Sequence, residues 1–433
     1  MKKLLTCLLS IAVVFSLLTP AFATSGSDSL TVRQEQEYQS NLEYTSLIGS
    51  FWADYDGGYP DYYAGAYIND DGRLVVQVCQ VSDDIISDVQ QRTGNNSVTI
   101  EEAKYSYNTL ISLKNHVTRY VSDHPTSEIT AMLSSASICD DTNNLEIGVV
   151  DTSVATTNAI LDELFPISLA SASNFSSAIS FVQEDKVELP APTAPELESE
   201  DSQQVMPNAA SNTLYAGDKI TTSSRYNLSV GFPCRRKLSS GAYEYGFVTA
   251  AHGCAKGDSV SYNGTVIGTV TEWKLDGRID CAFVKMTNTN YTFPHYVNLY
   301  YEDTGTSQVY PVSITTNIMV SVGSTVYKDG FKTNTTEGTV KSVNTDVFVG
   351  GNVQKTITDL IKTSPMTDQG DSGGLGFVIG RDATTLKTSA IKFGLVEADS
   401  DIWGIKTASY FVNYSYIYSD MPVYAYQLQD APW

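Results

Sequence analysis

Gly370-Asp371-Ser372-Gly373-Gly374 places one serine between glycines near the end of the chain, and Thr249-Ala250-Ala251-His252-Gly253 places one histidine after an apolar run far upstream. A serine hydroxyl is a weak nucleophile until a neighbouring base takes its proton, and His252 is a candidate for that base. The glycines allow backbone N–H groups to face a developing oxyanion without side chains in the way. Together the two stretches predict nucleophilic catalysis by Ser372.

A third candidate is Asp280, which lies in the apolar, strand-like run Ile279-Asp280-Cys281-Ala282-Phe283-Val284. An acid in such a run is costly to bury without a partner, and a histidine is a suitable partner because a carboxylate orients its ring. Without the other two motifs, Asp280 would be interpreted as an ordinary hydrogen-bonded polar residue. The order His252, Asp280, Ser372 is that of the chymotrypsin fold, and it argues against the subtilisin fold and against an esterase of the α/β-hydrolase kind.

At these residues the chain resembles the chymotrypsin-like serine proteases, and more closely the secreted bacterial branch made with a pro-domain, the streptogrisin and alpha-lytic protease group. Leu214-Tyr215-Ala216-Gly217-Asp218 is similar to the mature start of those enzymes, and residues 63–76 are similar to the opening hairpin of their pro-domain. The resemblance implies an all-β protease domain of two Greek-key barrels, preceded by a small α+β pro-domain. It also implies a secreted serine endopeptidase made as a zymogen, whose pro-domain is both folding template and inhibitor.

The resemblance also implies the roles of single residues. His252, Asp280 and Ser372 would form the catalytic triad, and the backbone N–H groups of Gly370 and Ser372 would form the oxyanion hole. The substrate would add as an extra strand beside residues 394–398, where Glu397 departs from the family's usual serine or glycine.

Two pairings concern residues near this site. In the resembled family a cystine joins the strand before the catalytic histidine to the turn after it, which implies a disulfide between Cys234 and Cys254. Asp371 is paired in many relatives by a freed N-terminus or by an internal arginine. Here either Arg235 or Arg236 fits that role, and a local hydrogen bond fits Asp371 equally well.

The chain is long enough for two domains and processing segments. Residues 1–23 are predicted to be a signal peptide, because Lys2 and Lys3 precede a short apolar run that ends at Ala21-Phe22-Ala23. A membrane anchor is the weaker alternative. We expect a pro-domain over 24–186, an acidic, proline-rich linker with the maturation site over 187–212, and the protease domain over 213–433.

The net charge of −22 is concentrated before residue 212: from there on, 18 Lys and Arg face 20 Asp and Glu, a net of −2, which leaves −20 for the first part. Neither part has a basic stripe, so we expect no nucleic-acid partner, and no membrane contact after signal removal. The expected partners are protein or peptide substrates and the chain's own pro-domain. No Cys or His spacing resembles a metal site, and no cofactor is expected.

The first half mixes element types. We expect a hairpin over 64–78, a helix opening at a capping box formed by Thr99 and Glu102, a strand over 145–150 and a helix over 154–164. An apolar stripe at helical spacing predicts one buried face for the helix after Thr99, at Ala103, Tyr107, Leu110, Leu113 and Val117.

The second half is rich in short β-type runs separated by Gly, Asn and Asp turns, which fits a pair of Greek-key barrels. These runs cover 243–249, 259–262, 265–271, 320–327 and 338–343. The competing interpretation of the whole chain is a secreted binding protein on a protease fold that has lost its activity, because a fold alone does not determine function.

Overall fold

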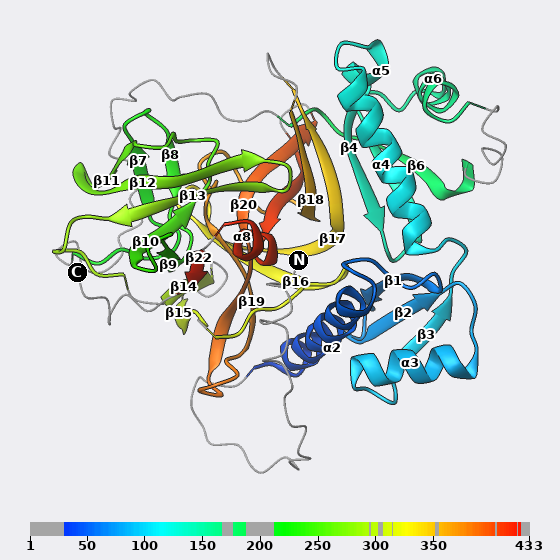
Figure 1. Cartoon of the computed structure of the whole chain (residues 1–433), viewed down its shortest axis with the longest axis horizontal. Coiled ribbons are helices and arrows are strands. Elements are labelled where there is room, and N and C mark those ends of the chain that lie inside the picture. Colours follow the sequence, from blue (N-terminus) through cyan, green and yellow to red (C-terminus); the bar gives the residue numbers. More distant parts are fainter. Residues whose placement is uncertain are drawn as a thin grey trace.

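The computed structural model describes residues 30–166, 176–187, 212–293, 296–301, 306–313, 315–350, 355–402, 405–421 and 423–425. Two curled β-sheets lie side by side, and the first half of the chain lies against the second of them (Figure 1). The predicted signal peptide and nearly all of the predicted linker fall outside the described residues. Within the described part, no helix combines the length and the apolar character needed to cross a membrane.

The first half builds one hydrophobic core shared by two small sheets and the helices that cover them. Its elements are α2 (Val32–Asp54), β1 (Tyr63–Ile68), β2 (Leu74–Val78), α3 (Asp83–Thr93), β3 (Thr99–Glu102), α4 (Tyr107–Asp123), α5 (Glu128–Met132), β4 (Leu133–Cys139), β5 (Asn144–Val149), α6 (Val154–Leu164) and β6 (Ile179–Gln183). This is the α+β architecture that the sequence predicts.

The predicted hairpin is present as β1 and β2, which pair antiparallel with Ile68 opposite Leu74. The predicted helix start is wrong. Thr99–Glu102 forms β3, which pairs parallel with β2, and the helix begins only after Ser106, whose hydroxyl accepts the N–H of Thr109. The capping motif at Thr99 is overridden because the segment gains ladder hydrogen bonds along β2 at the sheet edge.

Helix α2 was not predicted. Its buried face includes Glu37, Ser40 and Asn41 besides its apolar residues, so no clear apolar stripe marks it in the sequence. These polar groups are satisfied by distant partners: the Asn41 side chain accepts the N–H of Ser321 at 3.0 Å, for example. Such partners are visible only in the folded chain.

The first barrel is formed by seven strands before residue 287 and one short strand from the end of the chain, in the order β22-β9-β10-β13-β12-β11-β7-β8. The sheet closes because the chain leaving β8 runs beside β10, where the N–H of Gly231 donates to the carbonyl of Val248 at 2.9 Å. The strands are β7 (Lys219–Thr222), β8 (Asn227–Ser229), β9 (Pro233–Lys237), β10 (Tyr243–Thr249), β11 (Ser259–Tyr262), β12 (Thr265–Asp276), β13 (Ile279–Met286) and β22 (Val423–Ala425).

The second barrel has the order β16-β19-β20-β21-β18-β17, and β16 also pairs with β17, so the six strands form a closed ring. Its strands are β16 (Thr325–Gly330), β17 (Asn334–Val349), β18 (Lys355–Thr363), β19 (Leu375–Arg381), β20 (Thr388–Ile402) and β21 (Ile405–Asn413). A hairpin of β14 (Tyr296–Tyr301) and β15 (Thr306–Pro311) precedes it, and α8 (Tyr414–Asp420) follows it. The predicted double barrel is therefore confirmed.

The first half joins the second barrel by strand addition. Strand β4 pairs antiparallel with β17, with Ser137 opposite Thr345, so β4, β5 and β6 extend the second sheet to nine strands. Buried charges cross the same contact: Lys114 meets Asp346, and Lys362 lies 3.2 Å from Glu184. A strand pairing with buried ion pairs makes this a firm attachment.

Candidate active site

His252 lies in the turn that follows β10. Strand β10 ends in buried apolar residues, so the turn is anchored to the core of the first barrel. The indole N–H of Trp273 donates to the carbonyls of Ala251 and Cys254 at 2.8 and 2.7 Å, which fixes the turn on both sides of the histidine. The imidazole side chain is only 1% exposed, so solvent does not reach it in this form of the chain.

Asp280 lies on β13, the strand beside β10, and its carboxylate meets the imidazole directly. Its Oδ2 is hydrogen-bonded to Nδ1 of His252, and its Oδ1 accepts the backbone N–H groups of Ala251 at 2.6 Å and His252 at 2.9 Å. Burial acts to lower the pKa of His252, but the neighbouring Asp280 carboxylate outweighs it, so the pKa is raised. A carboxylate in this place orients the ring and stabilises its protonated form.

Ser372 comes from the second barrel, in the turn before β19. Its backbone carbonyl accepts the N–H of Ser229 at 2.8 Å, which ties the serine turn to the first barrel. Its hydroxyl donates to the backbone carbonyl of Glu397 at 3.3 Å. Nε2 of His252 is buried and has no hydrogen-bond partner among the described residues, so no hydrogen bond joins the Ser372 hydroxyl to the imidazole.

Gly370 has two structural reasons to be glycine. Its φ is +113°, in the region that side chains rarely adopt, and a Cβ there would lie 2.6 Å from the Phe331 ring. Within the described part of the chain, the backbone N–H groups of Gly370 and Ser372 donate to no intramolecular acceptor. Two such groups, separated by one residue, are available to a negatively charged oxygen.

The carboxylate of Asp371 is held by an internal lysine. Nζ of Lys328 lies 3.0 Å away, and both side chains are fully buried. The hydroxyl of Thr333 donates to the same carboxylate at 2.6 Å, and the backbone N–H groups of Lys332 and Asp368 donate at 2.9 and 3.0 Å. Burial lowers the pKa of Lys328, against the opposing effect of Asp371.

The arginines considered from the sequence do not make this contact. Arg236 pairs instead with Glu244 and Glu272, and Arg235 lies over the ring of Tyr243. The sequence could not single out Lys328, because it lies in an ordinary β-run and reaches Asp371 only through the pairing of β16 with β19.

The implied disulfide between Cys234 and Cys254 is contradicted, since both are free thiols. Cys234 packs in the core cluster that includes Cys281, whereas Cys254 packs in the separate cluster inside the first barrel. The Cys254 thiol lies 3.4 Å from the carbonyl of Ala250. The two sulfurs therefore belong to different packed groups. Burial also raises the pKa of the Cys281 thiol well above its usual range, as expected for an inert core residue.

Glu397 was noted from the sequence only because it stands where the resembled family usually has serine or glycine. It is fully buried on β20, and ligand atoms of His252, Asp280 and Glu397 lie within 4.8 Å of one another. Burial, followed by the charge of Asp280, raises the pKa of Glu397 to about 8. Three donors this close could also hold a cation, but two of them already bond each other.

Strand β20 offers an open edge beside the serine. Its pairing with β19 ends at Leu395, and on the other side it continues along β21 to Ile402. Among the described strands, none pairs with residues 397–402 on the first of these edges. Lys406, on the neighbouring strand β21, is bound by Asp368 at 3.3 Å and Asp399 at 2.8 Å.

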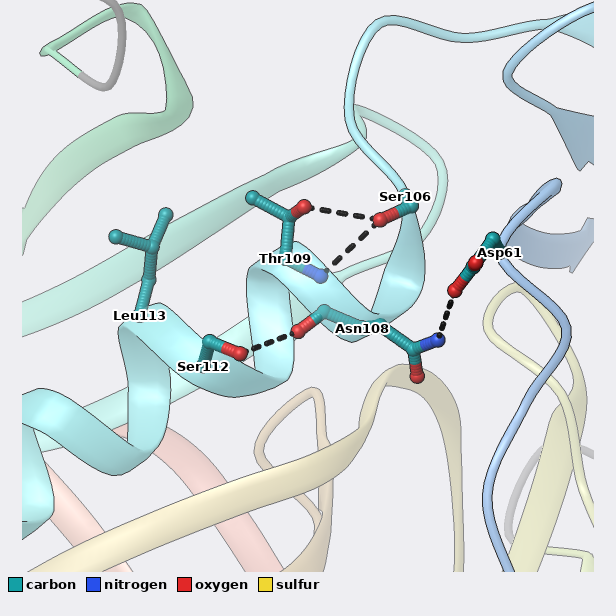
Figure 2. Close-up of a pocket in the computed structure, with 6 residues that line it drawn as sticks. All are labelled: Asp61, Ser106, Asn108, Thr109, Ser112 and Leu113. Atoms are coloured by element: carbon teal, nitrogen blue, oxygen red, sulfur yellow. Dashed lines mark hydrogen bonds between the residues drawn. The ribbon is translucent and has the colours of Figure 1, made fainter. Parts of the chain in front are cut away.

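A surface hollow of about 410 Å³ lies in the first half of the chain, at the start of α4 (Figure 2). Its polar side chains bond one another: the Asn108 amide lies 3.4 Å from Asp61, and Ser106 caps the helix. No residue of the candidate active site lines it.

Residues 30–103 match the family model "Pro-like N-terminal domain", and a search of curated proteins finds no match. Solved structures that resemble the chain include a chymotrypsin of Cellulomonas bogoriensis, at 23% identity and a TM-score of 0.39, covering 50% of this chain and 99% of that one. They also include the Nocardiopsis protease NAPase, at 24% identity and a TM-score of 0.39, covering 49% and 98%.

Protease A of Thermobifida fusca gives 23% identity and a TM-score of 0.38, covering 49% of this chain and 100% of that one. Scores of this size carry no weight for function, and the fold follows from the strand order described above. Two closed barrels, with the Ser372 turn on the second and a His–Asp pair on the first, have the chymotrypsin-like arrangement. The chain thus combines a segment, residues 30–103, that matches the Pro-like N-terminal domain model with a double barrel of the chymotrypsin-like fold.

Proposed function

We propose that the chain is a serine endopeptidase made as a zymogen. The proposal is supported by the buried His252–Asp280 pair of the first barrel and by the Ser372 turn of the second, which a hydrogen bond from Ser229 ties to the first barrel. Residue types, chain order and the unused N–H groups of Gly370 and Ser372 support the same reaction.

The reaction would follow from these positions. Ser372 attacks a peptide carbonyl while Nε2 of His252 takes its proton, and the imidazolium then returns a proton to the leaving amine. Asp280 holds the ring in the tautomer that leaves Nε2 free to act as the base. The N–H groups of Gly370 and Ser372 receive the oxyanion, and water then hydrolyses the acyl-enzyme. The open edge of β20 supports a substrate that adds as a strand.

The precursor form supports the zymogen part of the proposal. The imidazole is closed to solvent, and the Ser372 hydroxyl bonds the Glu397 carbonyl instead of Nε2. A rotation of the serine side chain would be needed before attack. The first half, attached through β4 and β17, is the proposed folding template and inhibitor. Secretion through the segment 1–23 completes the proposal.

The lack of a hydrogen bond between Ser372 and Nε2 of His252 also favours a second candidate, an inactive binding protein on the same fold. A fluorophosphonate probe distinguishes the two. We expect the probe to label the secreted, processed protein, Ser372→Ala to abolish labelling, and the exposed-serine control Ser240→Ala to leave it intact. Labelling that survives Ser372→Ala, or no labelling of processed protein, would contradict the endopeptidase.

Proteolysis itself is tested on a peptide library, with N-terminal sequencing of the processed species. We expect cleavage that depends on Ser372 and a new N-terminus between the two halves. A processed protein that labels but cleaves no peptide would leave only an acyl-accepting site and would overturn the peptidase assignment.

A further inference from the structure

Glu397 is a buried acid that the mechanism above does not use. Its side chain is fully buried, and neither carboxyl oxygen has a hydrogen-bond partner in the described part of the structure. Burying an ionised carboxylate without partners is costly in free energy, and proteins avoid this cost by neutralising the group. The carboxyl must therefore either hold a proton or share one.

The other acid of this cluster is Asp280, and ligand atoms of Glu397, Asp280 and His252 lie within 4.8 Å of one another. Asp280 already accepts three N–H groups, from Ala251 and His252, which stabilise its charged form. Two neighbouring carboxylates in one buried site do not both ionise readily. Glu397, whose oxygens lack hydrogen-bond partners among the described residues, is therefore the carboxyl that holds the proton.

The groups that face Glu397 are consistent with this division. Asp280 on β13 and Asp399 on β20 itself raise its pKa, after the larger effect of burial, whereas His252 and Lys355 on β18 lower it. The amine of Lys355 donates to the carbonyl of Leu275, so that cation is engaged elsewhere. The net effect is a pKa of about 8 for Glu397.

We propose that Glu397 is a positioning residue that keeps its proton at neutral pH and so leaves a single negative charge facing His252. This rests on the proposed function, because it assigns Glu397 a part in preparing the base. When Glu397 ionises at alkaline pH, a second anion faces the imidazole and strengthens its hold on a proton. A bound cation would have to displace the Asp280–His252 hydrogen bond, so the proton is the ion assigned here.

The test follows His252 by NMR and needs no catalysis. The full chain carrying Ser372→Ala is labelled with ¹⁵N-histidine, and the ring signals of His252 are followed from acid to alkaline pH. His252 is assigned by its loss in His252→Gln. We expect two inflections, one from the imidazole and one with an apparent pKa near 8 from Glu397.

In the same background, Glu397→Gln keeps a hydrogen-bond donor but cannot ionise, and we expect it to lose the second inflection. Glu397→Ser is the smaller alternative if the glutamine variant does not fold. Asp399→Asn is the matched control: it removes a nearby charge that pairs with Lys406, and both inflections should remain.

A single inflection in the parent, or a second inflection that persists in Glu397→Gln and Glu397→Ser, would overturn the proposal. So would loss of the second inflection in Asp399→Asn together with its persistence in Glu397→Gln. Failure of fluorophosphonate labelling would contradict the endopeptidase and would leave these titrations unchanged, so the two results are separable.

Discussion

The base half and the serine half of the site are built in different ways. Asp280 lies on β13, and His252 lies in the turn that follows the adjacent strand β10. Because Thr249 pairs with Ala282, the two side chains meet within a few residues of this strand pairing. Ser372 lies in a turn that depends on a buried Asp371–Lys328 pair and on hydrogen bonds to both barrels. The base half is a local construction, and the serine half is a property of the whole second barrel.

The first half of the chain attaches to the second barrel, which carries the serine half of the site. Its ladder of strand pairing joins β17 of the second barrel, and its helix α2 reaches β19, where the Tyr38 hydroxyl donates to the Arg381 carbonyl at 2.7 Å. Assistance from this domain is therefore expected to act on the serine half. Each experiment below asks whether the two halves can be disturbed separately.

The largest effect is expected in the base half. Asp280→Asn keeps the shape of the site but removes the charge that orients His252, and turnover should fall by about ten-thousandfold. The measurement is kcat on a peptide substrate with processed protein, and the exposed Asp276→Asn is the control. A loss below about tenfold would mean that Asp280 is not the orienting acid.

The next effect is expected in the serine half. Lys328→Met leaves the buried Asp371 charge without its cation and should lower the free energy of unfolding by roughly 3–5 kcal/mol. Urea unfolding of the full chain measures this, with the exposed Lys387→Met as control.

If the two halves are separable, the Lys328→Met protein should lose fluorophosphonate labelling while the His252 ring signals keep their Asp280-bound character. Retained labelling would show that the serine turn does not need the buried pair. Loss of both signatures would show that the halves form one cooperative unit.

A smaller effect is expected at the contact between the first half and the second barrel. Glu184 binds Lys362 and the hydroxyls of Ser135, Ser400 and Tyr410. Glu184→Gln should cost roughly 1–3 kcal/mol at pH 7, because it leaves the Lys362 amine incompletely paired. The exposed Glu102→Gln is the control, and an unchanged free energy of unfolding would contradict the role of this contact.

The same contact has a defined pH dependence. Burial acts to raise the pKa of Glu184, but Lys362 and the hydroxyls outweigh it, so the pKa lies below its usual value of 4.5. A group whose pKa is lower in the folded state stabilises above its unfolded pKa and loses that contribution as the pH falls through the folded value. The gap in stability between the parent and Glu184→Gln should therefore narrow below pH 4.5. A gap that widens in acid would contradict this sign.

The smallest effect concerns the thiols. With Cys234 and Cys254 free, a reductant should leave the free energy of unfolding unchanged, whereas loss of a native bridge would cost about 2–4 kcal/mol. Alkylation of the unfolded, unreduced protein should label both residues, as read by mass spectrometry. If Cys234 and Cys254 were alkylated only after reduction, the two residues would form a disulfide in the base half after all.

The success of the sequence-based predictions follows the same division between local and distant contacts. The β1–β2 hairpin and the His252 turn could be predicted because turn residues and apolar runs mark them within a few positions. Helix α2 and the start of α4 were missed, since a buried polar face and a sheet edge override local preference. The disulfide failed because pairing depends on which core each side chain enters.

By itself the sequence determined which reactive groups are present, namely a hydroxyl, an imidazole and an acid in a given order. It also determined that the half of the chain carrying them is rich in β-strands. Only the tertiary structure decided that Lys328 pairs with Asp371 and that Glu397 lies beside the His252–Asp280 pair. The physical reason is that motifs are read from neighbours along the chain, whereas the charge state of a buried group is set by whatever the closed barrels bring next to it.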